Sequence, residues 1–426
     1  MKLDVNPLVA LCDQKIEICV SGLPAYGQVK ISASLRYPWA EDVLFESAAC
    51  FTADAQGRVD LSRQKPEPGG SYDFIDSMGL IVSLHSQDPR ATQKIVQGIS
   101  VDHNLHIDIV AECGQERASA HLERMLKGQD IQRLRISDEF VGELYYSENT
   151  SRKTIIWLGG SGSNLEVNAP VAALLASHGF NVLAVSYFSD PGLPAQLSEV
   201  PLEYFDKVFA WLAKSPITRG KEIRILGMSK GAELALLLAS RNPFITRVVV
   251  WAPHAYCFQG IAFKNVSSWT YAGKSLPFIR IKNRWIFADA LDCFIKNKHF
   301  GFTTAYKKAL SVAENKDAAR IKIEAAQADL MLFTSKDCGM WNTYDGSLEI
   351  MDTLRKCNYP HAYQMVVYED TGEPYYAPNV FPATETTMKM APRLVLDMGG
   401  TLQGNAHAKE DAWLKTIEFL GQPSKN

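Results

Sequence analysis

From about Thr154 onward, short runs of entirely apolar residues alternate with stretches that have helical spacing. The apolar runs predict strands at 154–159, 181–187, 223–226, 248–251, 330–333 and 363–368. The stretches between them predict helices at 168–178, 202–213 and 230–240, and a last helix that begins near His407. Strands without polar alternation are buried on both faces, which is typical of a parallel sheet covered by helices on each side. This half of the chain is therefore predicted to be an α/β domain.

The residues before this region have a different period. Apolar and polar residues alternate between Lys15 and about Cys113, which predicts strands with one buried face. Turn residues, including Pro68-Gly69-Gly70, separate these strands at the spacing of a small sandwich. We therefore predict an all-β sandwich domain over residues 1–125 and an α/β domain over residues 126–426.

Two other segments interrupt this pattern. Residues 136–147 are predicted to cross from one domain to the other as an extended segment. Residues 254–326 mix aromatic, basic and helical stretches where another strand would be expected, and this predicts a cap over the carboxyl edge of the sheet.

Composition excludes several classes of function. The net charge is −3 without a long block of like charge, so a nucleic-acid partner is not expected. No stretch approaches about 20 consecutive apolar residues, and the first residues lack the apolar run of a signal peptide. The eight cysteines show no Cys-x-x-Cys spacing, which argues against a zinc site or a disulfide framework. We expect a cytoplasmic protein with no membrane partner, no metal and no cofactor.

The sequence Gly227-Met228-Ser229-Lys230-Gly231 lies between a predicted strand and a predicted helix. In a nucleophile elbow the serine occupies a strained strand-to-helix turn, and small flanking residues are needed there. Gly227 and Gly231 meet that requirement, so Ser229 is predicted to be a nucleophile. A serine that only caps the helix is the alternative.

An acyl-transfer nucleophile needs two backbone N–H groups that stabilise an oxyanion. One is expected from Lys230, directly after the nucleophile, and the other from the loop after an early strand. Gly160 or Ser161 in the glycine-rich loop after the first apolar run is the candidate, although these glycines could also form a simple turn.

The base and the acid are harder to assign. In this fold the order along the chain is Ser, acid, His, and the histidines after Ser229 are His254, His299, His361 and His407. His361 precedes a strand and so lies at the amino edge, away from the chemistry. His254 and His299 could line a pocket without acting as base. His407 near the last helix is the predicted base, with a capping or packing role as an equal alternative. Asp337, after a strand, is the predicted acid, and an exposed loop aspartate is the alternative.

Several motifs resemble the acyl-CoA thioesterase and bile acid-CoA:amino acid N-acyltransferase family. They are Ser77-Met78-Gly79-Leu80, Ala176-Ser177-His178-Gly179-Phe180, Leu202-Glu203-Tyr204-Phe205, the elbow from Leu226 to Leu234, and Ala406-His407-Ala408. The resemblance covers nearly the whole chain and implies that the first domain is immunoglobulin-like. It also implies hydrolysis of an acyl thioester, or transfer of the acyl group to an amine, through an acyl-enzyme. The partner would be acyl-CoA or another small acyl thioester, with an acyl carrier protein as an alternative.

The sequence departs from this family at two positions. The family's triad acid is the second Asp of a Gly-x-Asp-Asp loop before a Trp, and Cys338 occupies that position here. The family's triad His follows a Thr-Gly pair, and Glu373 follows Thr371-Gly372 here. Because thioesterase members carry Ser at the elbow and conjugating members carry Cys, Ser229 favours hydrolysis.

Three hypotheses follow from these departures. Asp337 and His407 could replace the missing pair. Glu373 or Lys230 could assist Ser229 in a different mechanism, including transfer to a carrier or another small nucleophile. The site could instead have lost catalysis and bind an acyl thioester or a partner protein, because a serine without an activating base is a poor nucleophile.

Overall fold

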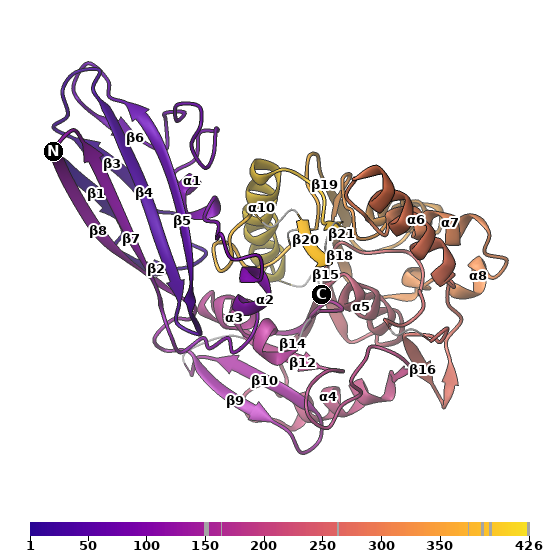
Figure 1. The fold of residues 1–426 in the computed structure, drawn as a ribbon. Helices are drawn as coiled ribbons and strands as arrows, with labels where there is room; N and C mark the ends of the chain where they lie inside the picture. The colour runs from indigo at the N-terminus through magenta and orange to yellow at the C-terminus, as the bar shows by residue number, and fades with distance from the viewer. Residues whose placement is uncertain are drawn as a thin grey trace.

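The computed structural model describes residues 1–148, 153–162, 164–261, 264–373, 375–384, 387–391 and 394–423. Its largest element is an eight-stranded sheet in the order β19-β18-β15-β14-β11-β12-β10-β9 (Figure 1). The strands are β9 (Gln132–Ile136), β10 (Val141–Tyr146), β11 (Lys153–Leu158), β12 (Asn181–Ser186), β14 (Glu222–Met228), β15 (Ile245–Trp251), β18 (Asp329–Ser335) and β19 (Tyr363–Tyr368). Neighbours from β12 to β19 in this order are parallel. The predicted α/β fold class is confirmed.

Helices cover both faces of the sheet, because successive side chains of each strand enter different apolar clusters. Trp157 of β11 packs in the cluster that also contains residues of α3 and α10, whereas Ile156 packs with residues of α4, α5 and α9. The helices are α3 (Leu165–Ser177), α4 (Glu203–Lys214), α5 (Lys230–Arg241), α9 (Thr343–Lys356) and α10 (Leu402–Gly421). The expected start of the last helix near His407 is wrong. The hydroxyl of Thr401 accepts a hydrogen bond from the N–H of Gly404 and caps the helix several residues earlier.

The segment expected to cross between domains is part of the sheet. β10 pairs antiparallel with both β9 and β12, so the two strands form a hairpin at the edge of the sheet. The pairing of β9 is not apparent from the sequence, because β9 is the edge strand and most of its residues are exposed. A strand with little buried surface lacks the apolar run by which the central strands are recognised.

The segment between β15 and β18 contains short elements above the sheet. They are β16 (Trp269–Tyr271), β17 (Lys274–Ser275), α6 (Asn283–Lys296), α7 (Thr303–Ser311), α8 (Lys316–Ala319) and the 3₁₀ helix η1 (Ile323–Ala325). β16 pairs with β13 (Val200–Pro201), which precedes α4. Near the C-terminus, β20 (Thr387–Ala391) and β21 (Leu394–Asp397) form a separate hairpin. No helix in the described ranges is long and apolar enough to cross a membrane.

The first residues form a separate strand-rich region at the N-terminal end of Figure 1. One sheet has the order β1-β3-β6 and the other β2-β8-β7-β4-β5. Their bounds are β1 (Lys2–Asn6), β2 (Val9–Leu11), β3 (Glu17–Ser21), β4 (Gln28–Tyr37), β5 (Ala40–Thr52), β6 (Val59–Asp60), β7 (Leu105–Cys113) and β8 (Glu116–Met125), with short helices α1 (Gly79–Val82) and α2 (Ala91–Ile95). Side chains alternate between buried and exposed along β4, as the period of two predicts. Immunoglobulin-like topology and a boundary at residue 125 stay predictions.

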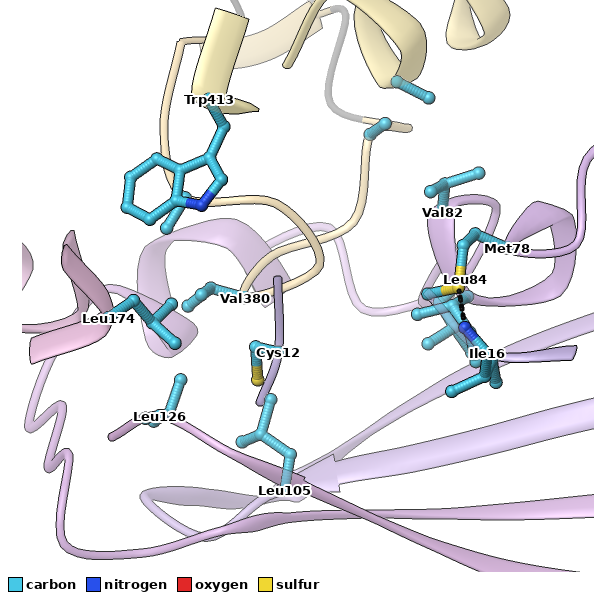
Figure 2. Close-up of a cluster of buried hydrophobic side chains, with 14 of the residues drawn as sticks. Cys12, Ile16, Met78, Val82, Leu84, Leu105, Leu126, Leu174, Val380 and Trp413 are labelled. Atoms are coloured by element: carbon cyan, nitrogen blue, oxygen red, sulfur yellow. Dashed lines mark hydrogen bonds between the residues drawn. The ribbon is translucent and has the colours of Figure 1, made fainter. Parts of the chain in front are cut away.

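A continuous apolar cluster joins the two regions. Figure 2 shows Cys12 and Leu105 of the first region beside Leu174 of α3 and Trp413 of α10. Polar contacts cross the same boundary: the Tyr37 hydroxyl donates to the carbonyl of Val380 over 2.8 Å. The strand-rich region therefore supports the face of the sheet that α3 and α10 cover.

Candidate active site

Ser229 occupies a strained turn between β14 and α5. Its backbone has φ 53° and ψ −117°, a conformation that non-glycine residues rarely adopt. Its N–H donates to the carbonyl of Trp251 over 2.8 Å. A Cβ atom at Gly231 would lie 2.1 Å from the carbonyl oxygen of Leu158, so only glycine fits there. A Cβ at Gly227 would likewise lie 2.4 Å from the carbonyl oxygen of Gly231. The geometry is that of a nucleophile elbow.

The side chain of Ser229 is hydrogen-bonded to the carboxyl group of Glu373. Glu373 lies in the loop after β19, and its Oε2 atom is 3.6 Å from the Sγ atom of Cys338. The two residues that depart from the family pattern therefore lie together beside the elbow serine. The carboxyl group of Glu373 thus interacts with both Ser229 and Cys338.

The loop that carries Glu373 is held by buried hydrogen bonds. The N–H of Gly372 donates to Oδ1 of Asn405 on α10 over 2.9 Å, and the amide of Asn405 donates to the carbonyl of Gly399 over 3.2 Å. The hydroxyl of Ser335 at the end of β18 donates to the carbonyl of Gly372. These contacts fix the backbone next to Glu373, and no sequence motif predicts this role for Asn405.

Burial raises the pKa of both Glu373 and Cys338. Desolvation raises the pKa of Glu373 from 4.5 to about 7, although hydrogen bonds from Ser229 and Cys338 oppose the rise. Desolvation and the nearby Glu373 raise the pKa of the Cys338 thiol well above its usual value. The sulfur also accepts hydrogen bonds from the backbone N–H groups of Met340 and Trp341. Cys338 is therefore a protonated thiol, which donates to Glu373.

The predicted oxyanion-hole residues lie next to Ser229. A Cβ built on Gly160 would be 3.3 Å from the Cβ of Ser229, so the glycine backbone approaches Ser229 closely. Ser161, Ser229 and Lys230 line one cavity. The structure thus brings together Ser229, Gly160, Ser161 and the backbone of Lys230 at one point.

The side chain of Lys230 has other partners. Its Nζ atom forms an ion pair of 2.7 Å with Glu233 and lies 3.5 Å from the carbonyl oxygen of Phe258. Glu233 also accepts a 2.6 Å hydrogen bond from Nε1 of Trp269. The ammonium group therefore ties α5 to the segment above it, and nothing in its contacts favours a role as base for Ser229.

The structure does not bring His407 to Ser229. Its imidazole lies 3.4 Å from a carboxylate oxygen of Asp76 and packs edge-on against Phe74, both in the strand-rich region. The hydrogen bond with Asp76 raises the pKa of His407. The side chain of His407 lies on the face of α10 that contacts the strand-rich region, so it is not placed to act as a base for Ser229.

The predicted acid is not brought to the nucleophile either. The side chain of Asp337 is exposed, and the described residues include no hydrogen bond between it and an imidazole. Its neighbour Cys338 points inward instead and is buried. At the position where the resemblance implies the triad acid, the chain therefore presents a buried thiol.

The remaining histidines lie elsewhere. His254 is buried among the rings of Tyr256, Phe258 and Trp341, and burial lowers its pKa to about 3, so it is neutral. His361 lies 3.2 Å from the amide oxygen of Gln327, at the amino end of β19. No group of three potential metal ligands occurs in the part of the chain that the structure describes.

A cavity of about 330 Å³ opens at Ser229. Its other lining residues come largely from the segment above the sheet and from the loop after β18, and most are apolar or amide side chains: Gln196, Gln259, Gly260, Ile261, Ile281, Asn283, Ile286, Phe302, Tyr306, Met340 and Trp341. The cavity can take an apolar group whose reacting carbon lies at the Ser229 hydroxyl. Sequence patterns did not identify these lining residues, because they come from distant segments without a shared motif.

Comparison with known proteins finds relatives along nearly the whole chain. Residues 200–425 match the family described as "BAAT / Acyl-CoA thioester hydrolase C terminal", and residues 13–138 match "Acyl-CoA thioester hydrolase/BAAT N-terminal region". The mouse acyl-coenzyme A thioesterase 6 is 26% identical, and the alignment covers 98% of this chain and 96% of that protein. The mouse bile acid-CoA:amino acid N-acyltransferase is 27% identical, with 99% and 97% covered. A solved dienelactone hydrolase from Anabaena variabilis is 12% identical, with 70% of this chain and 100% of that chain covered and a TM-score of 0.38.

Proposed function

The chain belongs to the acyl-CoA thioester hydrolase/BAAT family, and from that premise we propose that it hydrolyses acyl thioesters at Ser229 with Glu373 as the general base. One observation carries the proposal. The elbow hydroxyl, open to an apolar cavity, is hydrogen-bonded to a carboxyl group whose pKa is about 7. A general base is most effective when its pKa lies near the working pH.

The first half of the reaction forms an acyl-enzyme. Glu373 takes the proton of the Ser229 hydroxyl while the oxygen attacks the thioester carbonyl. The oxyanion of the tetrahedral intermediate accepts hydrogen bonds from the N–H of Lys230 and from that of Gly160 or Ser161. The C–S bond then breaks, and the leaving thiolate takes the proton from Glu373.

The second half releases the acid. A water molecule loses a proton to Glu373 and attacks the acyl-enzyme carbonyl, and the Ser229 oxygen leaves with that proton. The same carboxyl therefore acts as base and then as acid in each half. A carboxyl with an ordinary pKa would be a weak base for either step, so the desolvation of Glu373 is the property on which the rate depends.

Cys338 explains why a glutamate can act here. An aspartate at this position would stabilise a protonated histidine. Beside Glu373 it would place a second carboxylate where the thiol now lies, 3.6 Å from the Glu373 oxygen, and would oppose ionisation of the base. A neutral thiol donates a hydrogen bond to the carboxylate instead. The two departures from the family pattern are thus chemically consistent with each other, and this favours an active site over one that has lost catalysis.

The substrate class rests on the relatives and the cavity. Several relatives are named acyl-coenzyme A thioesterases, and the cavity at Ser229 is mainly apolar, as an acyl group requires. We propose acyl-CoA as substrate, with no cofactor, and an acyl carrier protein as the alternative donor. A cytoplasmic location stays a prediction.

Transfer of the acyl group to an amine is the second candidate, because one relative is an N-acyltransferase. Ser229 favours hydrolysis, since the resemblance associates serine with the hydrolysing members. The two activities are separated by their products: hydrolysis gives the free acid, whereas transfer to an added amino acid gives an amide.

The test uses a fluorophosphonate probe and acyl-CoA turnover. Wild type should be labelled and should release thiol from acyl-CoA, and Ser229→Ala should do neither. Thr343→Ser, at a buried hydroxyl outside the site, serves as a matched control. If the Ser229→Ala protein is labelled or turns over like wild type, Ser229 is not the nucleophile.

A further inference from the structure

A second hollow adjoins the cavity at Ser229 and has the opposite character. It has a volume of about 460 Å³ and is lined by Gln259, Asn265 and the five residues from Arg280 to Arg284. We propose that this basic groove, as we call it, binds the phosphate groups of the nucleotide part of acyl-coenzyme A. The inference rests on the proposed function and adds to it the place where the carrier of the acyl group is recognised.

The charge of the basic groove is of one sign. Arg280, Lys282 and Arg284 line it, and no aspartate or glutamate does. Arg280 and Arg284 are exposed, and Lys282 is partly buried against the ring of Trp285 at 5.2 Å. Among the described residues, no carboxylate forms an ion pair with any of the three. Neighbouring cations without a counter-charge repel one another, and a multiply charged anion would relieve that repulsion.

The groove adjoins the catalytic cavity. Gln259, Ile281 and Asn283 line both hollows. A ligand whose carbonyl lies at Ser229 can therefore extend past these residues to the three cations. Two of the three shared side chains are amides, which suit an uncharged polar linker that carries its own amide groups.

The wall of the groove is already formed. The N–H of Gln259 donates to the carbonyl of Ile279 over 3.1 Å, and its side-chain oxygen accepts from the N–H of Ile281 over 2.8 Å. These bonds fix the strand-like segment that carries Arg280 and Lys282. α6 begins at Asn283 without an acidic residue in its first turn (Figure 1). Its N-terminal end therefore adds to the positive potential.

The order of these features matches the chemistry of acyl-CoA. Its acyl group is joined through a thioester and an uncharged amide-containing arm to a diphosphate and a 3′-phosphate. Apolar cavity, amide neck and cationic groove follow in the same order. Arginine forks bind phosphate oxygens in pairs, so Arg280 and Arg284 give selectivity as well as charge.

The experiment compares two substrates with the same acyl group, acyl-CoA and acyl-pantetheine, which lacks the nucleotide phosphates. In the R280Q/K282Q/R284Q variant, kcat/KM for acyl-CoA should fall roughly tenfold or more through KM, while that for acyl-pantetheine stays within about twofold. The control K296Q/K298Q/K307Q removes the same charge from exposed positions of the same segment. It should leave both substrates unchanged within about twofold.

A binding measurement on Ser229→Ala separates this proposal from the proposed function, because it needs no turnover. Adenosine 3′,5′-bisphosphate should bind to this protein, and the groove variant should weaken its binding about tenfold. Equal losses for acyl-CoA and acyl-pantetheine, or an acyl-CoA KM unchanged by the groove variant, would overturn the assignment. So would a loss confined to an acyl carrier protein as donor, since the groove would then serve a protein surface.

Discussion

Replacement of Glu373 by glutamine tests two effects of the carboxyl group, its role as a general base and its effect on the stability of the fold. Glutamine has nearly the same shape and can still accept the hydrogen bond from Ser229, but it cannot take the proton. General-base catalysis contributes typically about 10²- to 10⁴-fold. We therefore expect kcat/KM of Glu373→Gln at pH 8 to fall at least about 10²-fold. In wild type, kcat/KM should rise with pH and level off above about pH 7, the pKa of Glu373.

The same substitution should lower activity but raise the stability of the folded protein. The pKa of Glu373 is about 7 in the folded protein against 4.5 for the ordinary group. Because the folded value is the higher one, the carboxyl destabilises the fold increasingly as the pH rises from 4.5 through 7. Between pH 5 and pH 8 the wild type should lose at most about 2 to 3 kcal/mol of stability relative to Glu373→Gln.

This stability difference is measurable by thermal unfolding. Glu373→Gln should unfold at a higher temperature than wild type at pH 8, by roughly 3 °C, and the difference should shrink at pH 5. Glu369→Gln, at an exposed glutamate just before the same loop, is the control and should change neither rate nor midpoint appreciably. Full activity of Glu373→Gln at pH 8, or a wild-type rate that does not vary between pH 5 and pH 8, would refute a carboxyl base.

Two further substitutions test the neighbours of this carboxyl. Cys338→Asp places a second carboxylate beside Glu373, so the pH profile of kcat/KM should shift upward by about one pH unit or more. The double variant Cys338→Asp/Glu373→His should be more active than either single variant. A double variant no more active than the singles would contradict the argument that the two residues depend on each other. His407→Ala should keep kcat/KM within about twofold of wild type but lower stability by about 0.5 kcal/mol, because the half-exposed pair with Asp76 is lost. Since that pair raises the pKa of His407, its stabilisation is present below pH 6.5 and fades as pH rises through the folded pKa, and a large rate loss would restore His407 as base.

The elbow and the central sheet could be predicted because their signals are local. Gly227 and Gly231 flank Ser229 within five residues, so the pattern can be read from the sequence, and the close contacts in the structure explain why both must be glycine. The buried strands are continuous apolar runs for an equally local reason. β9 was missed as a sheet strand because an exposed edge leaves little trace in the period of the sequence. β10 is buried, but Gly142 and Glu143 interrupt its apolar run.

The residues that interact with Ser229 could not be identified from the sequence. Glu373 and Cys338 come from loops after two different strands, and only the fold brings their side chains within 3.6 Å of each other. Neither a glutamate nor a cysteine by itself indicates a general base or the partner of one. His407 was the conventional choice, but its imidazole lies beside Asp76 and Phe74 of the strand-rich region. Which neighbours a helix face meets is set by the packing of distant segments, and the sequence of the helix alone does not show it.

In the proposed mechanism, catalysis by a carboxylate base depends on the exclusion of water from the cavity. The pKa of Glu373 is high because desolvation outweighs the hydrogen bonds from Ser229 and Cys338. A bound acyl chain among residues such as Tyr306 and Trp341 displaces water from the same cavity and strengthens the desolvation further. The base therefore becomes stronger as the site fills. A histidine base would respond in the opposite sense, because desolvation lowers its pKa, as it does for buried His254. In the proposed mechanism, glutamate in place of the histidine that the resemblance implies would thus be a stronger proton acceptor when an apolar substrate is bound.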